Sequence, residues 1–551
     1  MIRNPFLAAA LSSSALFALA SCAPEEGPTR LPCPDGQTCL HFGNVSEPKS
    51  LDPHKASGTW ENRIISETIL GLTSYDAAGQ PIPAAAESWT VSEDGLTWTF
   101  RLRRGATWSD GVPVTAHDFV FALRRLLNPE TAAEYASITY LIKNAQPINE
   151  GNAPLDSLGA RAVDDYTLEL TLEHPAPYLP ELATHYTMFP VPRHVVQRVG
   201  DAWVQPANFV GNGPYVLKEW RLGDYVRLDR NPRWTEPLCI DRVYFYPTTS
   251  AVDAQRRVLR GELDVNGDIQ SNRIGPLRDN PATAPYVRTH VWLGTAYLAF
   301  NTGDKGEIPA LKDVRVRRAL AMAIDRDFIA NKLLRGGQVP AYGLVPPGIA
   351  GYVENGPKAF YADWPLERRQ AEARRLLAEA GYGPENPLRF ELKHRNSADP
   401  MLFMPAIQAD WRAIGVDARL VVNETQIAYQ SYRIRDFDVA DAAWIADYNN
   451  AMSFLYLMDS STGPQNYGDY NNPVYDDLLN QADAEKDAVK RAEILARAEQ
   501  IMLDDAPIAP IFFYVNKNLV SPRVTGWVDN VVDHHRVRYL CLKDGASVAA
   551  R

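Results

Sequence analysis

Side chains able to do chemistry are plentiful in this sequence, but none of them stands in a recognisable catalytic motif. The chain contains no G-x-S-x-G elbow, no H-E-x-x-H motif and no phosphate-binding P-loop. Aspartate and glutamate are abundant, yet no pair of them is singled out for acid–base catalysis. The sequence therefore gives little support to an enzyme such as an exported hydrolase, and we expect no cofactor.

Two adjacent histidines, His534 and His535, are the residues that most invite a search for a metal site. Neighbouring residues of a β-strand point to opposite faces, so one strand would not turn both rings toward a single ion. We therefore expect both to be surface residues and expect no metal.

Four cysteines follow the N-terminal region, and an even number in an exported chain suggests two disulfides with three possible connectivities. Cys33 and Cys39 enclose a turn sequence, so a local bridge is our first choice. Cys541 lies in a strand-like run, 537–542, and Cys239 precedes another. A bridge between these two would tie the C-terminal tail to the body. The spacings match no zinc pattern.

The N-terminus has the pattern of a secretory signal over residues 1–21. Arg3 precedes an apolar run from Phe6 to Ala20, which is too short to span a membrane. Leu19-Ala20-Ser21-Cys22 resembles the lipobox of bacterial lipoproteins, which predicts a lipid on Cys22. The alternative is ordinary cleavage near Ala20, with Cys22 incidental. Residues 22–38, rich in Pro, Gly and Glu, are predicted to form a tether.

Size and charge limit what the rest of the chain can be. At 551 residues it is too long for one compact core, so two or three domains are expected. Its 46% hydrophobic and 22% charged residues suit a globular protein. A net charge of −11 argues against a nucleic-acid partner.

The clearest local pattern lies between residues 87 and 129. Trp89 and Val91 alternate with polar residues, as do Trp98 and Phe100 beyond a Glu-Asp-Gly turn, which predicts a β-hairpin with one buried aromatic face. Thr115 three residues before Asp118 is a helix-capping pattern, and Asn128-Pro129 would end that helix.

Helical and strand patterns alternate through most of the remaining chain, which predicts a mixed α/β class. The clearest helices are 315–325, 366–380 and 488–504. The clearest strands are 225–228, 242–246, 418–422 and 508–515.

Several motifs together resemble the extracytoplasmic solute-binding proteins of family 5, the peptide and nickel ABC-transporter class. The resemblance covers nearly the whole chain after the signal. Besides 87–129 it is carried by Leu51-Asp52-Pro53-His54-Lys55, Gly211-Asn212-Gly213-Pro214-Tyr215, Asp313-Val314-Arg315-Val316-Arg317-Arg318-Ala319-Leu320 and Trp444-Ile445-Ala446-Asp447-Tyr448-Asn449.

The resemblance implies a class II periplasmic-binding-protein-like fold, with two α/β lobes that close about a hinge and an additional inserted α+β domain. Mapped onto this chain, domain I would comprise 39–69, 194–293 and 516–551. Domain II would be 70–193, and domain III 294–515. A ligand would be enclosed between domains I and III, with hinges near 293 and 515.

The resemblance also implies that Asp447 binds the α-ammonium of a peptide. A free peptide carries that charge whatever its side chains, and charge-assisted hydrogen bonds to a carboxylate are among the strong ones. The alternative is a structural aspartate that caps a turn before Asn449 and Asn450.

Further ligand contacts are implied along the cleft. Trp444 matches a tryptophan that walls it, Tyr135 matches a tyrosine that hydrogen-bonds peptide main chain, and Ser57-Gly58-Thr59 matches a segment whose backbone pairs with the ligand. Plain core packing is the alternative for Trp444 and Tyr135.

Basic groups that would meet the peptide's carboxyl end are less well matched. Arg433 and Lys305 correspond approximately to such groups. Asp441 stands where a member of the family has arginine, and a free acid there would repel a carboxylate and argue against dipeptides. Gly294 and Ile445 stand where that member has bridging cysteines.

The resemblance therefore implies a periplasm-facing, lipid-anchored, monomeric component of an ABC importer that delivers oligopeptides to a permease driven by ATPase subunits. Other ligands of the family remain alternatives: a dipeptide, a murein peptide, a nickel complex, haem or a plant-derived compound. A lipoprotein that senses peptides would use the same cleft.

Overall fold

The computed structural model describes residues 30–56, 58–133, 135–267 and 269–543. Helices and strands alternate through most of these residues, which confirms the predicted α/β class. No helix within these ranges is both long enough and apolar enough to cross a membrane. The predicted signal over 1–21, the lipid on Cys22 and Ser57 lie outside the described residues.

One large sheet runs through the molecule and contains eleven strands in the described part of the chain. Its order is β15-β14-β16-β12-β17-β11-β1-β10-β9-β8, with β13 paired to β17. The strands are β1 (Cys39–Gly43), β8 (Tyr215–Arg221), β9 (Tyr225–Arg230), β10 (Arg242–Tyr246), β11 (Val265–Asn266), β12 (Val287–Phe300), β13 (Val339–Pro340), β14 (Leu388–Arg395), β15 (Val416–Asn423), β16 (Val439–Ile445) and β17 (Ile508–Val520).

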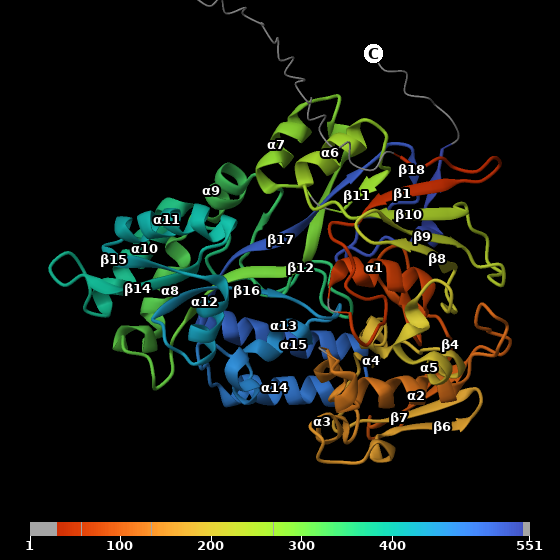
Figure 1. Cartoon of the computed structure of the whole chain (residues 1–551). Helices are drawn as coiled ribbons and strands as arrows, with labels where there is room; N and C mark the ends of the chain where they lie inside the picture. The colour runs from red at the N-terminus through yellow and green to blue at the C-terminus, as the bar shows by residue number, and fades with distance from the viewer. Residues whose placement is uncertain (1–29, 57, 134, 268, 544–551) are drawn as a thin grey trace, which may run out of the picture.

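Strands β12 and β17 are the two longest, and they join the two halves of this sheet (Figure 1). They are antiparallel, and their ladder has two separate stretches. Residues 287–291 pair with 515–519, and residues 295–299 pair with 508–513. A register shift between Val291 and Thr295 separates the stretches, so the ladder is interrupted where the chain passes from one half to the other.

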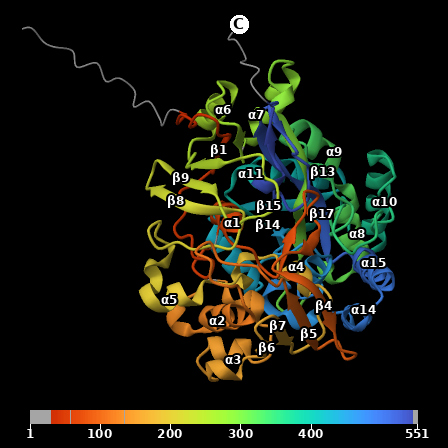
Figure 2. The same ribbon diagram turned by 90° about the vertical axis from the view of Figure 1, so that its right-hand side faces the viewer.

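A second sheet of four antiparallel strands, ordered β4-β5-β7-β6, lies at one end of the molecule with helix α2 (Figures 1 and 2). These elements are β4 (Ala86–Val91), β5 (Thr97–Leu102), β6 (Ala160–Asp164), β7 (Thr167–Thr171) and α2 (Ala116–Leu127). The predicted hairpin is confirmed, with Trp98 and Phe100 buried. Val91 is 42% exposed, contrary to expectation, because it ends an edge strand.

The helix predicted after Thr115 is also confirmed. Asp118 accepts a hydrogen bond from the Thr115 backbone N–H at 2.9 Å, and the helix ends before Asn128. The sequence patterns placed other elements within a few residues. Helices α8 (Val314–Ala323), α10 (Leu366–Glu379) and α15 (Ala488–Asp505) correspond to the three predicted helices.

The remaining helices cover the faces and ends of the two sheets (Figure 1). They are α1 (Thr59–Thr68), α3 (Ala145–Asn149), α4 (Leu179–Leu182), α5 (Arg193–Val199), α6 (Ala251–Leu259), α7 (Ser271–Asp279), α9 (Arg326–Phe328), α11 (Ala398–Ala413), α12 (Thr425–Arg433), α13 (Met452–Leu455) and α14 (Pro473–Ala484). Two small antiparallel pairs complete the fold: β2 (Thr73–Tyr75) with β3 (Pro81–Pro83), and β18 (Val524–Thr525) with β19 (Cys541–Leu542).

Separate apolar clusters lie on the two sides of the large sheet's central strands. One packs helices α8, α10 and α11 against β14–β16, with Leu320, Leu392 and Trp411 fully buried. A smaller one at the other end contains Tyr246 and Ile274. The predicted limits of the three domains are not decided by these clusters and stay a prediction.

Both predicted disulfides are confirmed. Cys33 pairs with Cys39 at a Cα–Cα distance of 5.7 Å, and Cys239 pairs with Cys541 at 5.1 Å. The strand expected over 537–542 is shorter than predicted, because a 3₁₀ turn occupies Val537–Tyr539 and only β19 follows it.

The predicted tether is only partly right. Residues 22–29 are outside the described ranges, but residues 30–38 lie against the body of the protein. Arg30 forms an ion pair with the fully buried Asp264 at 3.2 Å, and Leu31 packs on the apolar cluster around Tyr246. The Cys33–Cys39 bridge closes this segment directly before β1.

Candidate functional site

Asp447 lies at the point where the chain leaves the central strand β16. The end of that strand is held firmly, since Ile445 pairs with Gly294 of β12 and the Ala446 backbone N–H donates to the Leu293 carbonyl at 2.8 Å. A Cβ on Gly294 would lie 2.3 Å from the Ile445 side chain, so the glycine makes room for it. The first residue free of the ladder is therefore Asp447.

The Asp447 carboxylate opens into a recess of about 380 Å³. Aromatic rings form part of its wall: Tyr178 stacks on Tyr448 with centroids 5.0 Å apart, and Tyr456 also lines it. Two more acids, Asp459 and Asp483, face the same space. A recess with aromatic walls and several carboxylates is suited to a cation.

Asp447 is the acid in this recess that has no partner. Among the described residues nothing donates a hydrogen bond to it or forms an ion pair with it, so the alternative of a turn-capping aspartate is contradicted. Its side chain remains accessible to water, and partial desolvation by the surrounding protein raises the pKa of Asp447 to about 6. Asp483 differs, because Arg491 lies 3.9 Å from it.

Trp444 is half-buried on β16 opposite Thr295, and its ring packs edge-on against Tyr456 at 5.7 Å. It also packs against the main apolar cluster. The indole N–H is buried and has no hydrogen-bond partner within the described ranges. Both sequence interpretations therefore apply, since the ring packs on the core and keeps a free donor beside Asp447.

Gly58 and Thr59 lie at the start of helix α1, on the other side of the molecule's centre. Gly58 caps the helix, and a Cβ there would lie 2.4 Å from the Glu61 carboxylate. Its small size thus serves its own neighbours. Thr59 is exposed and borders a cavity of about 320 Å³ that Trp292 and His534 also line.

The other predicted ligand contacts do not converge on Asp447. Tyr135 is half-buried, with its ring 5.8 Å from that of His185. Arg433 is exposed at the end of α12. Lys305 is exposed in a separate hollow lined by Glu391, Lys393 and Asp438.

Asp441 is not the free acid that the sequence suggested. It is fully buried on β16, and Arg395 of β14 binds it through two hydrogen bonds of 2.7 and 2.9 Å. The same guanidinium donates to the Tyr429 hydroxyl at 2.7 Å. Because Arg395 neutralises Asp441, the expected repulsion of a carboxylate is wrong, and with it the argument against short peptides.

The expectation for the two adjacent histidines is wrong as well. They lie in an irregular segment rather than a strand, and neither is exposed. His534 approaches the Asn62 side chain of α1 at 3.4 Å, whereas His535 turns toward Asp533 at 3.0 Å.

Sequence patterns missed Tyr178, Asp483 and Arg395. Tyr178 reaches Asp447's recess from α4 and Asp483 from α14, so neither has a local signal near residue 447. Arg395 could have been suspected, because a buried acid such as Asp441 needs a cation from a neighbouring strand.

Comparison with known proteins identifies the family. A family model of the bacterial extracellular solute-binding proteins, family 5, matches residues 80–466, and the chain belongs to this family. It has the family's two-lobed α/β binding-protein fold. These proteins bind solutes rather than transform them.

Among individual relatives, the periplasmic oligopeptide-binding protein OppA of Salmonella typhimurium is 37% identical over 96% of both chains. The periplasmic murein peptide-binding protein MppA of Escherichia coli is 37% identical over 88% of this chain and 89% of that protein.

Solved structures show which arrangement of the lobes is present. The unliganded open form of MppA matches with a TM-score of 0.85, at 35% identity over 94% of this chain and 99% of that one. Haemophilus influenzae OppA in complex with the peptide RPPGFSPFR matches with 0.69, also at 35% identity, over 92% and 99%. At equal identity, this structure is thus more like the open form than the peptide complex.

Proposed function

We propose that this chain binds oligopeptides that have a free N-terminus and delivers them to an ABC importer. The observation that carries the proposal is the unpaired carboxylate of Asp447, held at the end of β16 in a recess with aromatic walls. A peptide ammonium would supply the missing partner and form charge-assisted hydrogen bonds there. Trp444 would add its free indole N–H beside it.

Binding would close the two halves of the large sheet on the peptide. The halves would be domains I (39–69, 194–293, 516–551) and III (294–515), with domain II (70–193) beside them. Motion would occur where the β12–β17 ladder is interrupted. Closure would bring the Ser57–Thr59 segment and Tyr135 toward a ligand anchored at Asp447, which explains why these residues lie apart in the open arrangement.

The carboxyl end of the peptide would meet basic side chains of domain III. Arg433 and Lys305 are both exposed and have no ion-pair partner among the described residues. Because they lie in different places, peptides of different length would reach different groups.

The relatives' names support a periplasmic location and an importer as partner. A signal over 1–21 and a lipid on Cys22 would keep the protein at a membrane surface, and we propose that it acts there as a monomer. The permease would recognise the closed form.

Native mass spectrometry of protein purified directly from cells tests the proposal. We expect a ladder of bound masses that match short peptides, and release of these peptides on denaturation. Masses that all contain murein-type D-amino acids would assign the chain to murein peptides, as for MppA. A single non-peptide mass or a metal complex in the cleft would refute peptide binding.

A further inference from the structure

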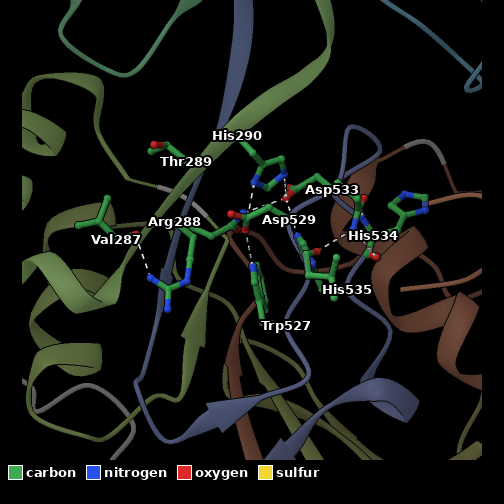
Figure 3. A network of polar contacts seen from close by, with 12 residues as sticks. Val287, Arg288, Thr289, His290, Trp527, Asp529, Asp533, His534 and His535 are labelled. Carbon is green, nitrogen blue, oxygen red and sulfur yellow. Dashed lines mark hydrogen bonds and ion pairs between the residues drawn. The ribbon is translucent and has the colours of Figure 1, made fainter. Parts of the chain in front are cut away.

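Three side chains that can bind metals converge beside strand β12, away from the recess of Asp447 (Figure 3). His290 belongs to the first half of β12, whereas Asp533 and His535 belong to the segment after β18. One ligand atom from each lies within 4.8 Å of the others. The Asp533 carboxylate oxygen Oδ1 is 3.5 Å from Nε2 of His290 and 3.0 Å from Nε2 of His535.

His290 is nine-tenths buried and lacks the hydrogen bonds that a buried imidazole normally makes. Its side chain is 10% exposed, and neither ring nitrogen has a hydrogen-bond partner in the part of the chain that the structure describes. Each nitrogen has only a carboxylate oxygen at 3.5 Å. Buried polar atoms without partners are rare in folded proteins, and they often mark a place where an ion binds.

The spacing of the three ligand atoms fits a small tetrahedral ion. Bonds of about 2.0–2.1 Å to nitrogen and oxygen place neighbouring ligands of tetrahedral zinc about 3.3 Å apart. The two separations at Asp533, 3.0 and 3.5 Å, bracket this value. Two imidazoles and one carboxylate are ligands that zinc prefers, whereas calcium and magnesium prefer oxygen alone.

An outer shell already orients these ligands. Nδ1 of His290 faces the Asp529 carboxylate, which directs Nε2 toward Asp533 (Figure 3). The Trp527 indole N–H donates to Asp529 at 2.9 Å, and the Trp527 ring stacks on His535 with centroids 3.5 Å apart. Asn518 of β17 donates to Asp533 at 2.8 Å. Carboxylates and ring contacts of this kind are how metal-binding histidines are held in position.

We propose that His290, Asp533 and His535 bind a zinc-class divalent cation, with Asp529 as the positioning residue for His290. A fourth position would be left to water. The ion would fasten the crossing strand β12 to the C-terminal segment and so stiffen the domain I side of the hinge. This site is independent of the peptide site and would persist if the ligand of the cleft were something else.

A proton is the competing occupant of the cluster. Burial opposes a charge on the ring, but Asp529 and Asp533 overcome it and raise the pKa of His290 to about 9. If the cluster is only a set of ion pairs around a protonated histidine, zinc will not bind there stoichiometrically near neutral pH. The experiment must therefore distinguish a bound ion from a bound proton.

The test uses the tag-free full-length mature protein, treated with EDTA and titrated with zinc chloride by calorimetry, with the metal content measured by mass spectrometry. We expect one zinc per chain and a higher melting temperature with zinc than with EDTA. His535→Ala and His290→Ala should each abolish stoichiometric binding and the thermal shift. Asp529→Asn should weaken binding by about tenfold or more, as removal of an outer-shell partner typically does.

His534→Ala is the matched control, because its ring lies in the same segment but approaches Asn62. It should bind zinc like the parent. Melting in EDTA shows whether each variant is folded, and Asp533→Asn offers a conservative change if an alanine variant is not. Cobalt(II) absorption in the parent should report four-coordinate nitrogen and oxygen ligation. No stoichiometric zinc in the parent, or equal loss in His534→Ala and His535→Ala, would overturn the proposal.

Discussion

At the scale of single residues, Asp447 differs from the other acids near it because it lacks a partner while Asp483 has Arg491 nearby. Removing its charge should cost the charge-assisted hydrogen bonds to a peptide ammonium, each worth about 1.5–3 kcal/mol. Asp447→Asn should therefore weaken peptide binding by at least about tenfold. Calorimetry with a free-amine peptide and its N-acetylated form measures this.

The acetylated peptide is the control for that variant. It should bind the parent weakly and should lose little further affinity on Asp447→Asn, since the interaction is already absent. Equal binding of both peptides to the parent would contradict the role of Asp447 as the ammonium anchor.

The raised pKa of Asp447 predicts how peptide affinity depends on pH. Only the ionised carboxylate attracts an ammonium, so affinity should be steady above pH 6 and fall about tenfold per pH unit below it. It should fall again above about pH 8, where the peptide amine loses its proton. Titration calorimetry across pH 4.5–9 checks the profile, and Asp447→Asn should lack the acidic limb.

Residue-scale prediction from sequence succeeded where the motif itself held the information and failed where partners came from afar. The motif around Asp447 indicated the acid, and the structure leaves it unpaired as a binding role requires. The same reasoning misjudged Asp441, because its neutralising Arg395 lies on another strand. It also placed His535 on the surface, because the approach of His290 depends on the fold of β12.

At the scale of elements, the Arg395–Asp441 pair joins β14 to β16 and is almost fully buried, with side chains 10% and 0% exposed. Asp441→Ala would leave a guanidinium buried without its counter-charge, which typically costs about 3–5 kcal/mol. We expect a clear loss of stability in chemical denaturation. The exposed pair Arg389–Asp417 on neighbouring strands is the control, and Asp417→Ala should change little.

The double variant Arg395→Met with Asp441→Leu tests the explanation. Replacing both charges with apolar groups removes the unpaired charge, so most of the lost stability should return. If Asp441→Ala were as stable as the parent, the pair would have no structural importance.

The two disulfides should contribute very differently. Cys239 and Cys541 are separated by 302 residues, and Cys33 and Cys39 by 6. Loop-closure entropy gives about 6 kcal/mol for the longer loop and about 2 kcal/mol for the shorter. Replacing Cys239 and Cys541 by serine should lower the melting temperature more than replacing Cys33 and Cys39. Equal shifts would show that chain entropy is not the source of the stabilisation.

Elements of regular pattern were predictable from the sequence, and their pairing was not. The alternation around Phe100 and the capping pair Thr115 and Asp118 are local signals, so the hairpin and the following helix were found. The order of strands in the large sheet depends on contacts between distant segments, such as β1 beside β10 and β11, and no local pattern reports them.

At the scale of the whole molecule, the open arrangement predicts a change of shape on binding. Small-angle scattering should show a smaller radius of gyration when a saturating free-amine peptide is added, because the two halves of the sheet approach each other. Asp447→Asn at the same peptide concentration should remain in the open form. Calorimetric binding to the parent without any change in scattering would contradict closure.

The interrupted ladder between β12 and β17 has a mechanical consequence. Hydrogen bonds on both sides of the break hold the two strands in register, so neither can shift along the other without losing a whole stretch of pairing. Sliding is thereby excluded, and only bending and twisting at the break remain. The protein is thus restricted to nearly one degree of freedom, and every closing stroke would return the same wall to the same position over Asp447.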